Sequence, residues 1–252
     1  MGLINPSKKY KSILVCGCSF TQGDLFTKDY SWGDSFAKRL GCEKIPVGMA
    51  GSSNFTIMSQ CISYCENNDM TDVCVGIQWS QSVRREIWNN LDKSYYVVNS
   101  DVFEGKTNSI PWINFEDNQV FAKNESFFNS IWWDYQENIM RTIHYMILVK
   151  NYLISKNIDF VMFEGIGSIM DYLPNFGEED LHIKPSLQLF TPKVRKGILN
   201  DDTFFSDCGD MFSAMYKRND FEKNENGGHP TLPICEWWAD ELMKYIDKIY
   251  KI

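Results

Sequence analysis

The sequence lacks several features that mark other classes of protein. No apolar run reaches the roughly 18 residues that a helix needs to cross a bilayer, and the first residues contain no apolar segment of a signal peptide. Positive charge is also scarce, because 25 Lys and Arg stand against 33 Asp and Glu, a formal net charge of -8. We therefore expect a cytoplasmic protein with no membrane partner and no nucleic-acid partner, although a local basic groove stays open.

Paired metal-binding cysteines are missing as well. The eight cysteines form no set of paired Cys-x-x-Cys motifs, so no metal site is predicted. Cys16 and Cys74 lie inside apolar runs, where a thiol behaves as a small buried hydrophobe and fits a reducing compartment. What the chain does contain is 44% hydrophobic residues, enough for a sizeable core. We predict a single domain over residues 1–252.

Short apolar runs alternate with helical periods along the chain. Extended runs that predict strands occur at 12–16, 44–47, 72–77 and 158–163. Helical spacing occurs at 33–40, 57–62, 131–156 and 233–252. This alternation predicts an α/β fold with a parallel sheet and right-handed crossovers. The irregular stretch at about 89–130 predicts an insertion or lid.

Ser19 follows the first predicted strand in the motif Gly-Cys-Ser-Phe-Thr at 17–21. This position lies at the carboxyl end of the sheet, where open α/β folds bind their ligands. The competing interpretation is that Ser19 caps a helix or lines a turn. The loop has no Gly-x-Gly-x-x-Gly or P-loop motif, which leaves a flavodoxin-like nucleotide or flavin binder with little support. Thr21 replaces the second glycine of the α/β-hydrolase elbow, Gly-x-Ser-x-Gly.

Only three histidines are available as a general base. His229 lies in a Gly-His-Pro sequence just before the last predicted helix, where a loop residue can approach a nucleophile at the carboxyl end of the sheet. His144 lies inside the long predicted helix among apolar neighbours, so we expect it to pack there. His182 lies in an acidic stretch and is expected at the surface.

Four blocks of the sequence together resemble the SGNH (GDSL-like) hydrolase superfamily. Residues 17–21 resemble its first block, Gly-Asp-Ser with a following Thr, and Gly51 falls in a loop similar to the second block. Residues 76–79 stand where the family has Gly-x-Asn-Asp, and residues 226–230 stand where it has Asp-x-x-His. The blocks arrive in the family's order and span nearly the whole chain.

The resemblance implies a flavodoxin-like three-layer α/β/α sandwich around a mostly parallel sheet, with ester hydrolysis as its activity and no cofactor. It implies Ser19 as the nucleophile, His229 as the base and Asn226 at the position of the orienting acid. The amides of Ser19 and Gly51, with the side chain of Gln78, would form the oxyanion hole. A small-molecule or glycan ester is the implied substrate, which leaves a carbohydrate O-deacetylase and a lipase-like enzyme open.

Three residues depart from the family pattern. Cys18 replaces the Asp of the first block, and Gln78 replaces the Asn of the third with a side chain one methylene longer. Asn226 replaces the acid of the fourth block, and an amide can orient an imidazole but cannot neutralise its charge. Acidic residues nearby in the sequence that could take this role are Glu225, Asp207 and Asp210. The rival hypothesis is a catalytically silent module that binds a glycan or a protein.

Two further residues after the third predicted strand are candidates for substrate binding, Trp79 and Arg84. A guanidinium can hold a carboxylate or phosphate through two hydrogen bonds, although a solvated helix face that pairs with Glu86 is the competing interpretation for Arg84. Ser52 and Asn54 are expected to cap the helix that follows Gly51.

Overall fold

The computed structural model of the chain describes residues 2–22, 30–82, 84–89, 94–98, 135–166, 202–218 and 229–251. Five strands form one sheet in the order β2-β1-β3-β6-β7, and every pairing in it is parallel. The strands are β1 (Ser12–Cys16), β2 (Glu43–Pro46), β3 (Val73–Trp79), β6 (Phe160–Glu164) and β7 (Phe204–Phe205). The predicted α/β fold with a parallel sheet is confirmed.

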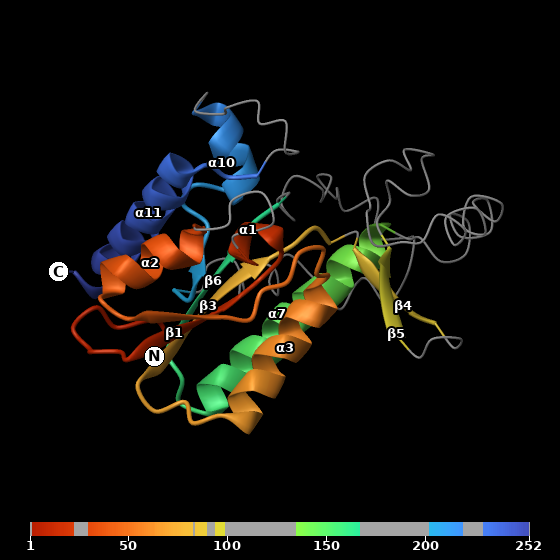
Figure 1. Ribbon diagram of the computed structural model, residues 1–252, viewed down its shortest axis with the longest axis horizontal. Coiled ribbons are helices and arrows are strands. Elements are labelled where there is room, and N and C mark those ends of the chain that lie inside the picture. Colours follow the sequence, from red (N-terminus) through yellow and green to blue (C-terminus); the bar gives the residue numbers. More distant parts are fainter. Residues whose placement is uncertain are drawn as a thin grey trace, which may run out of the picture.

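Helices cover both faces of this sheet (Figure 1). They are α1 (Ser19–Gln22), α2 (Trp32–Leu40), α3 (Asn54–Asn67), α7 (Tyr135–Ser155), α10 (Met211–Lys217) and α11 (Leu232–Tyr250). The pair α2 and α11 packs on one face, and the pair α3 and α7 packs on the other. Among the described helices, none has both the length and the apolar character that a membrane span requires.

The central strands are buried on both faces, which explains their continuous apolar runs. Successive side chains of a strand point to opposite faces. Val15 and Phe163 therefore join the core beneath α2 and α11. There the ring centroids of Phe163 and Trp238 are 5.2 Å apart. Leu14 and Ile77 join the second core, beneath α3 and α7. Two apolar clusters thus hold the sheet between its two helical layers.

All eight cysteines are free thiols. Burial raises the pKa of the Cys74 and Cys235 thiols, so both stay neutral and pack as small apolar groups. Cys18 has an exposed fraction of 0% and belongs to the core on the α2 and α11 face, where its thiol packs among apolar side chains.

The chain after β3 forms a hairpin rather than a helix. Strands β4 (Arg85–Asn89) and β5 (Ser94–Val98) pair antiparallel as a separate two-stranded sheet. The interpretation of Arg84 as part of a solvated helix face is therefore wrong. The reason is that β5 supplies the hydrogen-bonding partner of β4. The charge pattern of residues 84–86 alone cannot reveal that β5 pairs with them. The rest of the predicted insertion, 90–93 and 99–130, lies outside the described residues.

Candidate functional site

Ser19 lies at the carboxyl edge of the sheet, as its position after the first strand predicts. It is half-buried and begins the single turn of α1, directly after β1. The backbone amides of Thr21 and Gln22 donate to the carbonyl oxygen of Cys18, at 2.9 and 3.1 Å. A Cβ atom at Gly17 would clash with the hydroxyl of Thr21, so only glycine permits this tight turn.

The loop that carries Gly51 is bonded to the Ser19 turn. The amide of Met49 donates to the carbonyl of Gly17 (3.1 Å), and the amide of Ala50 donates to Oε1 of Gln22 (2.6 Å). Gly51 has a φ of 77°, a left-handed conformation that favours glycine. Within the described ranges, neither the Ser19 amide nor the Gly51 amide donates to a backbone carbonyl.

Gln78 is held through its Oε1 atom in a closed polar network beneath the turn. Its side chain is fully buried, and its Oε1 accepts from the Thr21 hydroxyl (2.5 Å) and the Trp32 indole N–H (3.3 Å). The same indole N–H also approaches the Thr21 oxygen at 2.9 Å. Because both donors bond to Oε1, the orientation of the Gln78 amide is fixed, and its Nε2 atom points away from Thr21 and Trp32. That nitrogen has no hydrogen-bond partner among the described residues.

The Nε2 atom of Gln78 packs directly against the backbone of Gly165. A Cβ atom at Gly165 would clash with this nitrogen. Gly165 also donates its amide to the carbonyl of Trp79 (2.8 Å) and accepts from the amide of Phe212 (3.0 Å). The chain after β6 is thereby tied both to β3 and to α10, and the longer side chain of Gln78 fits because Gly165 has none.

His229 lies beside the residue that follows Ser19. Its half-buried ring packs edge-on against Phe20, with 5.5 Å between ring centroids and an angle of 67°. Phe20 also stacks on Phe212 of α10, with 6.4 Å between ring centroids. The structure therefore brings the segment before α11 to the Ser19 turn, although the two come from opposite ends of the chain.

Two of the residues that were candidates to orient His229, Asn226 and Glu225, lie outside the described residues. Asp207 pairs with Lys248 at 2.9 Å near the end of α11, about 24 Å of helix rise from its start. Asp207 therefore lies toward the far end of α11, whereas His229 lies just before its start. Asp210 has an exposed fraction of 1%, and its Oδ1 accepts from the amide of Ser213 at 2.9 Å.

Two other candidates have clear positions. Trp79 has an exposed fraction of 1% and belongs to the core beneath α3 and α7. Its role in substrate binding stays a prediction. His144 lies on the exposed side of α7, and the expectation that it packs in the core is wrong. Its neighbours Ile143 and Met146 lie on the buried face of α7 instead. His182 lies outside the described residues.

The helix after Gly51 is capped by Ser53, whose hydroxyl accepts from the amide of Thr56 at 3.2 Å. The prediction that Ser52 and Asn54 form this cap is therefore wrong. Asn54 is the first residue of α3 and its side chain points inward. It accepts from the amide of Ser80 (2.7 Å) and donates to the hydroxyl of Thr142 (3.0 Å), which links β3 to α7.

A small polar cavity lies on the α3 and α7 face, and only one of its residues, Arg84, was a candidate from sequence. Its volume is about 10 Å³, and it is lined by Asn54, Ser82, Arg84, Asn138, Arg141, Thr142 and Tyr145. Arg84 donates Nη1 to the carbonyl of Ser52 at 3.4 Å. Asn138 and Arg141 could not be predicted from the sequence. They lie on α7, more than 50 residues after Arg84 in the chain, and only the tertiary fold brings them to the same cavity.

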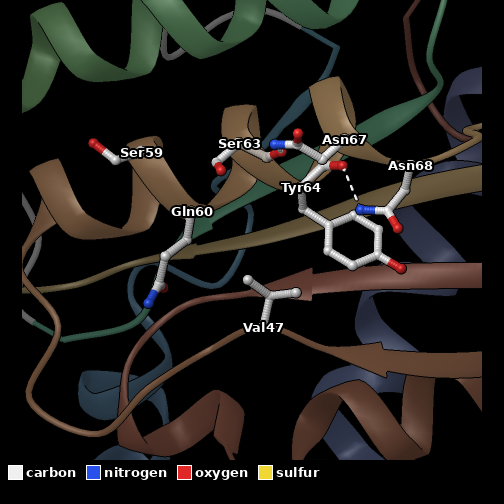
Figure 2. A pocket seen from close by; sticks show the side chains of 7 residues that line it. All are labelled: Val47, Ser59, Gln60, Ser63, Tyr64, Asn67 and Asn68. Carbon is white, nitrogen blue, oxygen red and sulfur yellow. Dashed lines mark hydrogen bonds between the residues drawn. The ribbon is translucent and has the colours of Figure 1, made fainter.

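A larger cavity, of about 490 Å³, lies along α3 near the end of β2. Figure 2 shows Val47 and the side chains of α3 around it, with the amide of Asn68 bonded to the carbonyl of Tyr64 (2.9 Å). Its lining residues are uncharged. None of the residues predicted from sequence to form the active site lines it.

The sheet order, the two helical layers and the serine turn at the carboxyl edge define an α/β fold of the three-layer type. The chain is similar in structure, over nearly its whole length, to lipases and esterases of the G-D-S-L kind. One is a protein assigned to the lipolytic G-D-S-L family from Desulfitobacterium hafniense, with 11% identity, a TM-score of 0.47, and coverage of 93% of this chain and 99% of that chain.

Two further structures are similar to the same extent. A GDSL-like lipase from Bacteroides thetaiotaomicron has 12% identity and a TM-score of 0.45, with 98% of this chain and 93% of that chain covered. An acetyl xylan esterase from the rumen bacterium Butyrivibrio proteoclasticus has 13% identity and a TM-score of 0.47, with 96% and 65% covered. No protein-family model and no curated protein matches the chain.

Proposed function

We propose that this protein is a serine hydrolase that cleaves an ester or removes an acyl group, with Ser19 as nucleophile and His229 as general base. The observation that carries the proposal is the contact between the rings of Phe20 and His229, at 5.5 Å, beside a serine that opens α1 at the carboxyl edge. A base and a nucleophile must lie close together, and this contact brings their two loops together.

The proposed reaction begins when Ser19 Oγ attacks the acyl carbon and its proton passes to His229. The ester bond then breaks, the departing alcohol takes that proton, and an acyl-serine remains. Water attacks the acyl-serine by the same route and releases the acid. The developing oxyanion would be held by the amides of Ser19 and Gly51, with Gln78 as a third donor.

Asn226 is the proposed orienting group for His229, by its place in the sequence. Asp210 is a second candidate, which a different observation favours. Asp210 is a buried carboxylate. Two residues later, Phe212 stacks on the Phe20 ring, and the same ring contacts His229. Asp210 would add the negative charge that an amide lacks, which stabilises an imidazolium formed during attack.

Replacement of the nucleophile tests the proposal. We expect Ser19→Ala to lower kcat for p-nitrophenyl acetate by at least about a thousandfold, because the acyl-serine can no longer form. A fluorophosphonate probe should label the wild type and leave Ser19→Ala unlabelled. Ser7→Ala is the matched control, since Ser7 is an exposed serine before the opposite end of β1. Its activity and labelling should equal those of the wild type.

The same experiment separates the hydrolase from its rival. A folded wild-type protein that neither hydrolyses the ester nor reacts with the probe would favour a catalytically silent binding module. Wild-type rates in Ser19→Ala would mean that the nucleophile is assigned wrongly.

A further inference from the structure

The small cavity on the α3 and α7 face combines positive charge with an unsatisfied buried amide. Asn138 has an exposed fraction of 1%, lines the cavity, and has no hydrogen-bond partner for either amide atom within the described part of the chain. A buried polar group without a partner costs free energy of folding, about 1–3 kcal/mol, unless a water or ligand supplies the bond. The Asn138 amide therefore marks a place where a water or one polar atom of a ligand fits.

Two guanidinium groups line the same cavity. Arg141 donates Nε and Nη2 to the Tyr145 hydroxyl, at 3.3 and 3.2 Å, and Arg84 donates to a backbone carbonyl. Among the residues that the structure describes, no carboxylate forms an ion pair with either arginine. Two arginines without an acidic partner in the described part of the chain are notable at a net charge of -8, and they favour a local positive potential.

The cavity is also connected to the proposed active site. Arg84 bonds to the carbonyl of Ser52, and Ser52 follows Gly51, the proposed oxyanion donor. Asn54, which begins α3 in the same loop, lines the cavity directly. A ligand group held here would therefore lie on the other side of the loop that carries the Gly51 amide.

We propose that Arg84, Arg141 and Asn138 form a subsite for a small oxyacid group, a carboxylate or a phosphate, carried by the substrate. This inference rests on the proposed hydrolase function and specifies its substrate class as anionic esters. The volume of about 10 Å³ admits one oxygen atom, which Asn138 Nδ2 can bond. The two guanidinium groups are only half-buried, so their planar donors can bind the oxygens of the group that stay outside this space.

Direct binding tests the subsite without any ester hydrolysis. Inorganic phosphate and benzoate are titrated separately into the Ser19→Ala protein by calorimetry, so that the two sources of the anion are distinguished. We expect one of them to bind, with affinity at least about tenfold weaker when Arg141→Gln or Arg84→Gln is added. Arg141→Lys keeps the charge and should retain part of the binding. Circular dichroism verifies that each variant is folded.

Arg39→Gln is the matched control, because Arg39 pairs with Asp240 at 2.7 Å on the other face of the sheet. It should bind the anion as the parent protein does. Binding should also weaken with rising KCl, since the attraction is between charges. The subsite is disproved if neither anion binds, if both glutamine variants bind as tightly as the parent, or if binding is insensitive to salt.

Kinetics then connects the subsite to the substrate. The probes are 4-acetoxybenzoate and 4-acetoxyphenyl phosphate, with methyl 4-acetoxybenzoate as the neutral ester. We expect Arg141→Gln to lower the ratio of kcat/KM for the anionic ester to that for the neutral ester by about tenfold. Arginine-dependent anion binding in a protein that hydrolyses no ester would support the subsite and refute the hydrolase. Hydrolysis without any preference for the anionic esters would refute the subsite's role in substrate choice and support the hydrolase.

Discussion

The two faces of the sheet carry polar groups of opposite character at the same carboxyl edge. On the α2 and α11 face, Gln78, Thr21 and Trp32 are fully buried. The Gln78 oxygen, the Thr21 hydroxyl and the Trp32 indole bond to one another, and only Gln78 Nε2 is left without a partner among the described residues. On the α3 and α7 face, Asn138 is equally buried but its amide has no partner among the described residues, and two arginines lie beside it. A closed network fixes the positions of its members, whereas an open one leaves donors for a ligand.

The closed network depends on the absence of a side chain at Gly165, and this dependence gives the largest expected effect. Gly165→Ala places a methyl group against Gln78 Nε2, so the Gln78 amide must move and lose its bonds to Thr21 and Trp32. We expect the free energy of unfolding to fall by about 3–5 kcal/mol, measured by urea denaturation.

Gly209→Ala is the control for this measurement. Gly209 has a φ of 73°, and a Cβ atom added there would meet only open space, so alanine adds backbone strain alone, about 1–2 kcal/mol. If Gly165→Ala costs no more than Gly209→Ala, the close contact with Gln78 does not matter to stability.

Two isosteric substitutions compare the faces directly, with an intermediate effect. Thr21→Val removes the hydroxyl that donates to Gln78 Oε1 and should cost about 2 kcal/mol, because a buried acceptor loses its nearer donor. Thr142→Val removes an acceptor of Asn54 Nδ2, which keeps its bond to the carbonyl of Ser80 at 3.0 Å, so about 1 kcal/mol is expected. Urea denaturation of both variants gives the comparison.

Thr21→Val should also lower kcat for p-nitrophenyl acetate by about tenfold, since Gln78 can then rotate away from the orientation in which Nε2 is a donor. Thr21→Ser keeps the hydroxyl and should restore most of that rate. An unchanged kcat in Thr21→Val would mean that the amide orientation of Gln78 does not contribute to the reaction.

The closed face could be predicted from the sequence to a greater extent than the open one. The apolar run of β1, the glycine after it and the histidine before the last helix are local signals, and they locate Ser19 and His229 correctly at one edge. The open face is built from α3, the end of β3 and α7. Asn138 in a single sequence is only a polar residue near the start of a long helix, and nothing local shows that Arg84 lies across from it.

The cap of α3 shows the same limit within one loop. Three consecutive residues, Ser52, Ser53 and Asn54, are all of types that cap helices, and residue preference alone cannot choose between them. Tertiary contacts decide, because Asn54 is taken up by Ser80 and Thr142 and so cannot serve as the cap. Ser53 remains with its hydroxyl toward the amide of Thr56.

A pair of alanine substitutions at this loop gives the smallest expected effect and the sharpest check on local geometry. Ser53→Ala removes the acceptor of the Thr56 amide and should cost about 1 kcal/mol in urea denaturation. Ser52→Ala should change stability by less than about 0.5 kcal/mol, since the Ser52 hydroxyl is buried without a partner among the described residues and alanine removes an unsatisfied group. The reverse order would place the cap at Ser52. That shift would move the carbonyl that accepts from Arg84, and with it the geometry on which the anion subsite depends.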